Sequence, residues 1–249
     1  MRVALLVSCL VDGLRPSVGA AALKLLRAAG CTVVVPKAQT CCGQPAWNSG
    51  DRATARGLAL RVLDQFAGVE AVVVPSGSCA GMVHQLPEVL GASHPRRAEA
   101  EALAARCYEI TTFLVEQCDY HPPPLGQGQT LTYHDSCAGL RELGVKTAPR
   151  ILLERAGYTL KEMAQAETCC GFGGTFCVKY PEISVAMADE KLASAGQAGA
   201  PLLTGGDLGC LLHLAGRSER STLDLAFRHV LELLVPERER PQALGQARA

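Results

Sequence analysis

The sequence Cys-Cys-Gly occurs twice, at residues 41–43 and 169–171, and a single cysteine precedes each copy by the same 32 residues. Another cysteine follows each copy, 37 residues after Cys42 and 40 residues after Cys170. Clustered cysteines at repeated spacings are typical of metal sites. The pattern therefore predicts a duplicated thiolate site built from two sets of four: Cys9, Cys41, Cys42 and Cys79, and Cys137, Cys169, Cys170 and Cys210.

The length of 249 residues allows one large domain or two halves of about 120 residues, each able to bury a core. The cysteine repeat favours two halves. The best linker is 121–128, His-Pro-Pro-Pro-Leu-Gly-Gln-Gly, so we place the boundary at 124. The predicted domains are residues 1–124 and 125–249, the second ending in a polar tail from about 236 to 249 that we expect to be frayed.

Both halves have the same order of predicted elements. Short apolar strands alternate with helices, which predicts parallel sheets with right-handed crossovers. We therefore expect an α/β fold of two similar Rossmann-like halves related by duplication. The predicted strands are 2–7, 32–35, 71–74, 130–133, 158–161 and 202–204, and the predicted helices are 18–29, 52–66, 84–117, 148–156, 181–195 and 222–234. Ligands of such sheets gather beyond the carboxyl ends of the strands, where these cysteines fall.

Charge and hydropathy exclude several classes of partner. The 24 basic residues balance the 24 acidic ones, so no net field attracts nucleic acid. Apolar runs are far shorter than the roughly 18 residues that a membrane span needs, so we expect no direct membrane insertion. The N-terminus reads as a strand and not as a signal peptide, and the regular element pattern is unlike a small disulfide-rich domain. We therefore expect a cytoplasmic protein.

Four thiolates are the usual complement of a 4Fe–4S cluster. Gly43 and Gly171 would allow the backbone turn that lets both adjacent cysteines face one centre. Zinc also takes four cysteines, but neither half has the paired C-x2-4-C spacing of its usual sites. A redox disulfide between adjacent cysteines stays an alternative. Cys177 is a possible additional ligand, whereas the cysteines outside the repeat, Cys31, Cys107 and Cys118, are expected to be core residues.

At these residues the chain resembles the CCG-domain, or cysteine-rich, iron–sulfur oxidoreductases, whose motif is a single cysteine, a Cys-Cys pair and a final C-x-x-C in two copies. The match covers both halves. The segments 169–176 (Cys-Cys-Gly-Phe-Gly-Gly-Thr-Phe) and 178–184 (Val-Lys-Tyr-Pro-Glu-Ile-Ser) look most like the lactate-utilisation group. The resemblance implies an iron–sulfur oxidoreductase subunit that works with a ferredoxin-like protein and a third subunit to oxidise a 2-hydroxy acid, L-lactate, to pyruvate.

The chain departs from the family motif at the last cysteine of each copy, where it has Met82 and His213. Heterodisulfide reductase members use five thiolates, so their chemistry is disfavoured here. Four thiolates per half still suffice for a cubane cluster. Glycolate or glycerol-3-phosphate dehydrogenase-type electron transfer and a non-catalytic, metal-stabilised assembly module stay as alternatives. His213 is a candidate extra ligand, and Met82 is expected to pack in the core.

Three polar residues lie near Cys137, and two of them fall at the predicted strand end. His134 and Asp135 could carry protons beside the second cluster, or could form a turn in which Asp135 bonds backbone amides. Arg141 is a candidate charge partner for a cluster or a carboxylate. No catalytic residue is assigned from the sequence.

Overall fold

The computed structural model describes residues 1–245 and has an α/β fold built on two four-stranded, all-parallel sheets. The first sheet has the order β2-β1-β3-β4 and the second has the equivalent order β6-β5-β7-β8. The predicted duplicated architecture is confirmed. The strands are β1 (Arg2–Leu5), β2 (Thr32–Val34), β3 (Ala71–Val74), β4 (Cys107–Glu109), β5 (Thr130–His134), β6 (Thr159–Leu160), β7 (Leu202–Gly205) and β8 (Ala226–His229).

Each sheet has one strand more than the sequence predicted. β4 lies within the segment 84–117, and β8 lies within 222–234, both of which we expected to be helical throughout. Both strands are three or four residues long and are followed at once by a short helix, so their apolar residues blend into a helical pattern. Pairing with β3 and β7 decides their conformation.

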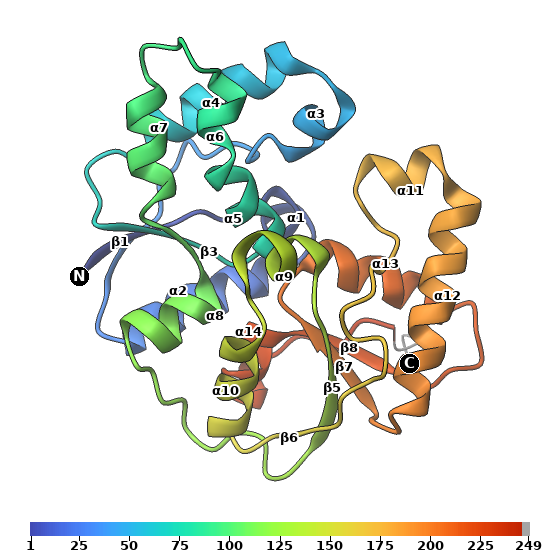
Figure 1. Ribbon diagram of the computed structural model, residues 1–249. Helices are drawn as coiled ribbons and strands as arrows, with labels where there is room; N and C mark the ends of the chain where they lie inside the picture. The colour runs from blue at the N-terminus through green and yellow to red at the C-terminus, as the bar shows by residue number, and fades with distance from the viewer. Residues whose placement is uncertain (246–249) are drawn as a thin grey trace.

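Helices surround both sheets, and Figure 1 shows the first half at the upper left and the second at the lower right. The first half contains α1 (Cys9–Leu14), α2 (Pro16–Ala28), α3 (Gln44–Ser49), α4 (Arg52–Gln65), α5 (Gly77–His84), α6 (Leu86–Leu90), α7 (Arg97–Ala104), α8 (Ile110–Thr112) and the π-helix η1 (Phe113–Gln117). The second contains α9 (Cys137–Leu143), α10 (Thr147–Arg155), α11 (Thr175–Lys179), α12 (Pro181–Gln197), α13 (Leu208–Ser218), α14 (Val230–Leu233) and the 3-10 helix η2 (Glu237–Glu239).

The two halves share a hydrophobic core. One cluster of buried side chains joins α2 and β1 of the first half to β5, α10 and α14 of the second. At its edge, Arg15 forms a buried, two-pronged ion pair with Glu232, with nitrogen to oxygen distances of 2.8 and 3.0 Å. Removing one partner of such a pair would leave a buried charge, so the pair fixes how the halves sit against each other.

The polar tail is ordered as far as the structure describes it. Leu244 exchanges two backbone hydrogen bonds with Phe227 on β8, at 2.9 and 3.0 Å, and so extends the edge of the second sheet. Residues 246–249, which we also expected to be frayed, lie outside the described residues.

Helices α5 and α9, one from each half, cross at a contact between two glycines. A Cβ atom placed on Gly77 would lie 2.6 Å from the Cα of Gly139, which is closer than real side chains approach. Each of these helices carries a predicted ligand in its first turn, Cys79 in α5 and Cys137 in α9. The crossing therefore brings the two cysteine sets toward each other.

We expect Gly77→Ala to lower the free energy of unfolding by about 1–3 kcal/mol, since the added methyl group has to push the two helix backbones apart. The matched control is Gly57→Ala on the exposed face of α4, where a Cβ meets nothing within 4 Å. There the change is expected to stabilise the protein by roughly 0.5–1 kcal/mol. Urea unfolding of both variants checks this. Equal effects at the two positions would contradict the tight crossing.

Candidate metal centres

The first cysteine set comes together from three loops. Cys9 begins α1, Cys79 lies in the first turn of α5, and the adjacent pair follows β2. The sulfur atoms of Cys9 and Cys41 lie 3.9 Å apart, and those of Cys42 and Cys79 lie 3.3 Å apart. The next residue, Gly43, has a φ of +95° and donates its backbone N–H to Cys41 Sγ at 3.5 Å. The left-handed glycine is the turn that lets both sulfurs face one point.

The second set repeats this arrangement. Cys137 begins α9 and Cys210 lies in the first turn of α13, so each set places two cysteines at helix N-termini. The backbone N–H groups of Gly171 and Phe172 point to the sulfurs of Cys169 and Cys170 at 3.4 and 3.5 Å. Helix N-termini and backbone N–H groups both stabilise negative charge on sulfur. Both sites are therefore prepared for thiolates.

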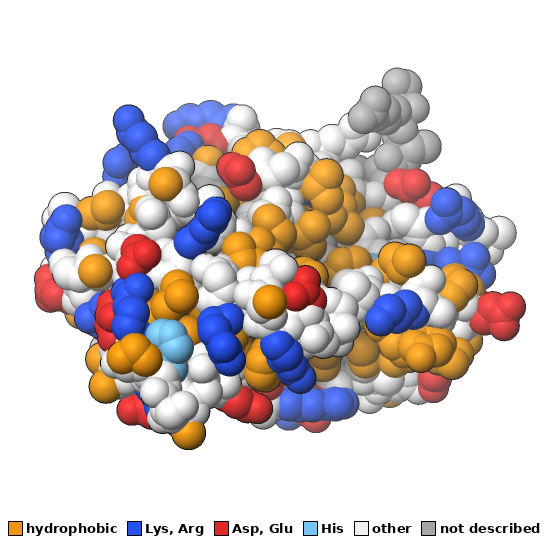
Figure 2. Space-filling model, turned by 90° about the horizontal axis from the view of Figure 1, so that it is seen from above, with side chains coloured by type: hydrophobic (Ala, Val, Ile, Leu, Met, Phe, Trp, Pro, Cys, Tyr) orange, Lys and Arg blue, Asp and Glu red, His pale blue; other side chains and the backbone are white. Residues whose placement is uncertain are grey.

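The two sets open on one cavity of about 410 Å³ between the halves. Viewed from above in Figure 2, apolar side chains gather toward the middle of the molecule. Phe172 and Leu10 contribute apolar walls, and Glu142 and Asp207 contribute carboxylates. Six of the eight cysteines line the cavity: Cys9, Cys41, Cys42, Cys79, Cys137 and Cys210.

Within each set, hydrogen bonds from neighbouring thiols lower the pKa of one cysteine. Hydrogen bonds from Cys42 and then Cys9 lower the pKa of Cys41 to about 2, and hydrogen bonds from Cys137 and then Cys170 do the same for Cys169. The neighbours that donate these bonds have their pKa raised. Cys41 and Cys169 are therefore the residues of their sets that most readily become thiolates. A metal that binds all four would have to displace the remaining protons.

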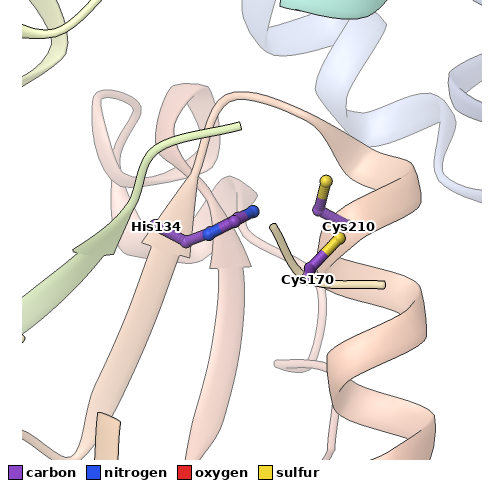
Figure 3. Close-up of side chains that lie close together, drawn as sticks. All are labelled: His134, Cys170 and Cys210. Carbon is purple, nitrogen blue, oxygen red and sulfur yellow. The ribbon is translucent and has the colours of Figure 1, made fainter. Parts of the chain in front are cut away.

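Two basic side chains are buried beside the second set. His134, at the end of β5, points toward the sulfurs of Cys170 and Cys210, and the three ligand atoms lie within 4.8 Å of one another (Figure 3). Burial lowers the pKa of His134 to about 3, so the ring is neutral near pH 7. Lys191 on α12 is fully buried and donates to the backbone carbonyls of Gln165 and Ala166, and burial lowers its pKa to about 8.

Sequence comparison gives the same two units. The pattern of the cysteine-rich domain called CCG matches residues 3–84 and 131–215, one copy in each half. The chain belongs to the CCG family of cysteine-rich domains. Both CCG copies contain one complete cysteine set, and the matched ranges end in α5 and α13, the helices that carry Cys79 and Cys210.

Similar proteins cover almost the whole CCG chain. Lactate utilization protein A of Bacillus cytotoxicus is 43% identical over 235 residues, which are 94% of this chain and 98% of the relative. The protein of the same name from Geobacillus kaustophilus is also 43% identical, with the same coverage. Among solved structures, a hypothetical protein from Helicobacter pylori has a TM-score of 0.69 at 9% identity, over 94% of this chain and 48% of its own. That likeness shows the fold alone.

The donor groups of the CCG sites suit a thiolate-ligated metal cluster. Each set offers four sulfurs, and backbone N–H groups face them. Both ring nitrogens of His134 are buried and have no hydrogen-bond partner among the described residues. A buried polar group without a partner costs about 1–3 kcal/mol, and such a group often marks a missing ligand. A cluster held by the second set would supply that partner.

The additional ligand candidates, Cys177 and His213, form hydrogen bonds outside the two cysteine sets. The thiol of Cys177 on α11 donates to the carbonyl of Gly174 at 3.0 Å, at the start of its own helix. His213 on α13 lies 3.2 Å from the Ser184 hydroxyl through Nε2, and burial lowers its pKa. Met82 is 1% exposed and packs with Cys42 and Cys79 in one hydrophobic cluster. Ligation by Cys177 or His213 stays a prediction.

Asp135 and Arg141 have separate environments. Asp135 forms a two-pronged ion pair with Arg150, with both contacts at 2.8 Å, and its backbone N–H bonds the Ala166 carbonyl. Its carboxylate is therefore already paired with a cation. Arg141 is exposed on α9.

The cysteines outside the repeat lie away from the cavity lining. Cys107 is buried in the core of the first half, where burial raises its pKa. Cys31 and Cys118 lie beside each other at the shared core, with their sulfurs 4.0 Å apart. Their structural role stays a prediction.

Three buried polar residues were missed in the sequence. Asp207 accepts bonds from the Ser78 N–H and the Ser76 and Ser78 hydroxyls at 2.9–3.1 Å, so a residue of the second half holds the start of α5 in the first. It stands three residues before Cys210, as Ser76 stands three before Cys79, so the repeat could have revealed it. Lys191 and Glu109 carry no such signal, because they lie in elements of ordinary composition.

Glu109 should make stability depend on pH. Burial raises its pKa from 4.5 to about 7, while the N–H groups of Thr111 and Thr112 bond its carboxylate. As pH rises above 4.5, the unfolded chain releases this proton before the folded chain does. The wild type should therefore lose at most about 3 kcal/mol of unfolding free energy between pH 4.5 and 7, relative to Glu109→Gln. Parallel slopes for the two proteins in urea unfolding would contradict this.

Proposed function

We propose that this protein is the iron–sulfur subunit of a lactate-oxidising system, which takes electrons released when L-lactate becomes pyruvate. Each four-cysteine set would hold a 4Fe–4S cluster. Such a cluster supplies one-electron transfer, while the protein holds it, limits its contact with water and sets its potential. The relatives named lactate utilization protein A support the substrate class.

The observation that carries this proposal is the position of both sets around one cavity. A duplicated metal site that served only to stabilise each half would not need to face its copy. Two centres that open on one cavity would instead be placed for electron exchange across it. The helix N-termini at Cys9, Cys79, Cys137 and Cys210 would offset the negative charge of the clusters.

The charges of the cavity favour a partner as the place where the hydroxy acid reacts. The cavity is lined by the carboxyl groups of Glu142 and Asp207 and by no Lys, Arg or His among the described residues, so it offers no cation to the carboxylate of lactate. We therefore propose that a second subunit binds the hydroxy acid and removes its electrons, and that a ferredoxin-like protein completes the system. The system would operate in the cytoplasm. The structure has no helix among residues 1–245 that is long and apolar enough to cross a membrane.

Disulfide reduction is supported less well. The final cysteine of the five-thiolate motif is replaced by Met82, which is packed in the core, and by His213, whose ring bonds Ser184. A site with four thiolates suits plain electron transfer better than the five-thiolate chemistry.

Iron and acid-labile sulfide in anaerobically prepared protein test the proposal. We expect both in the wild type, and about half as much in Cys42→Ser and in Cys170→Ser, because each variant breaks one set of four ligands. Cys118→Ser is the matched control, since this half-buried cysteine lies outside both sets and should leave the content unchanged.

Other metal contents would separate the alternatives. Zinc without iron or sulfide would support an assembly module and refute electron transfer. Unchanged iron in both Cys42→Ser and Cys170→Ser would refute the ligand assignment.

A further inference from the structure

The two sites have different residues at the position three before the first cysteine of each set. His134 stands three residues before Cys137, and Leu6 stands three residues before Cys9. Leu6 is 1% exposed and packs in the same hydrophobic cluster as Cys42 and Cys79. At this position an aliphatic side chain therefore packs beside the first set, whereas an imidazole packs beside the second set.

The ring of His134 is buried beside the second site. One of its ring nitrogens lies within 4.8 Å of the sulfurs of Cys170 and Cys210, and the side chain is 1% exposed. Neither nitrogen has a hydrogen-bond partner among residues 1–245. A neutral imidazole offers one N–H donor and one lone pair, so it can donate to a sulfur or ligate iron. Either contact would remove the cost of its burial.

A second difference lies one helix away. Lys191 on α12 is fully buried. Among the described residues, its ammonium group donates hydrogen bonds to two neutral backbone carbonyls. Its neighbours on the same helix, Ala188 and Leu192, pack in one hydrophobic cluster with Cys170 and Cys210, so its ammonium group lies beside the second set. The corresponding helix of the first half, α4, buries only apolar side chains: Ala55, Ala59, Val62 and Leu63. The anionic centre of the second set would therefore face a buried ammonium group that the first set lacks.

A nearby carboxylate does not cancel this charge. Asp135 lies in the same region, but Arg150 neutralises it through two contacts of 2.8 Å. Reduction adds negative charge to a cluster, so a nearby cation, a hydrogen-bond donor or a histidine ligand favours the reduced state and raises the potential. At the second site, Lys191 would supply the cation, and His134 would supply the hydrogen-bond donor or the histidine ligand.

Given the proposed iron–sulfur function, we infer that the two centres are not equivalent, and that His134 and Lys191 give the second centre the higher reduction potential. An electron that enters the protein would then come to rest at the second set. His134 contacts this centre directly, and Lys191 acts through its charge.

Redox titration followed by EPR tests this inference on the full chain, prepared anaerobically. In Cys42→Ser, which leaves the second set complete, the remaining centre should have a higher potential than the one left in Cys170→Ser. Adding His134→Leu, which copies the residue of the first half, should shift the second potential downward. Lys191→Met should shift it in the same direction. Equal potentials, or no downward shift in either variant, would overturn the inference.

Pulsed EPR on wild-type protein labelled with 15N-histidine detects a histidine at the second centre before any buried residue is changed. The second centre should show nitrogen coupling in the wild type and in the control His213→Gln, and should lose it in His134→Leu. A loaded second centre without coupling would overturn the role of His134 and leave the proposed function standing. Protein without iron and sulfide would overturn both.

Discussion

The contact between α5 and α9 is the constraint on which the site depends. These helices touch at Gly77 and Gly139, and each begins at a cysteine set of its own half. Asp207 adds a polar connection, because it leaves its own helix start and bonds Ser76 and Ser78 of the other half. Close backbone approach and buried hydrogen bonds together keep the carboxyl ends of the two sheets around one cavity.

The two sites share a duplicated scaffold and differ in the side chains packed around it. The strand order, the left-handed glycine after each Cys-Cys pair and the two cysteines at helix starts recur in both halves. The residues behind the sulfurs do not recur. Leu6 and the apolar face of α4 surround the first site, whereas His134 and Lys191 surround the second. A shared scaffold can thus hold two clusters in different electrostatic surroundings.

The alternation of short apolar strands with helices was enough to predict the fold class. The repeated spacing predicted two equivalent cysteine groups, because parallel strands bring their carboxyl ends to one edge. The structure brings each predicted set together. β4 and β8 escaped prediction because a strand of three or four residues joined directly to a helix leaves too little alternation to detect.

The cavity shared by the sets could not be predicted either, since spacing within a half does not determine how two halves dock. The burial of Lys191 could not be predicted for a similar reason. A lysine in a helix is usually exposed, and only the packing of α12 against the loop at 165–166 buries this one.

The central claim is that both cysteine sets hold an iron–sulfur centre beside one cavity. Anomalous diffraction from anaerobically grown crystals, at the iron absorption edge, tests it most directly. The account predicts two separate iron positions, one within bonding distance of Cys9, Cys41, Cys42 and Cys79 and the other of Cys137, Cys169, Cys170 and Cys210. A signal at the zinc edge alone, or iron at sites away from these sulfurs, would contradict it.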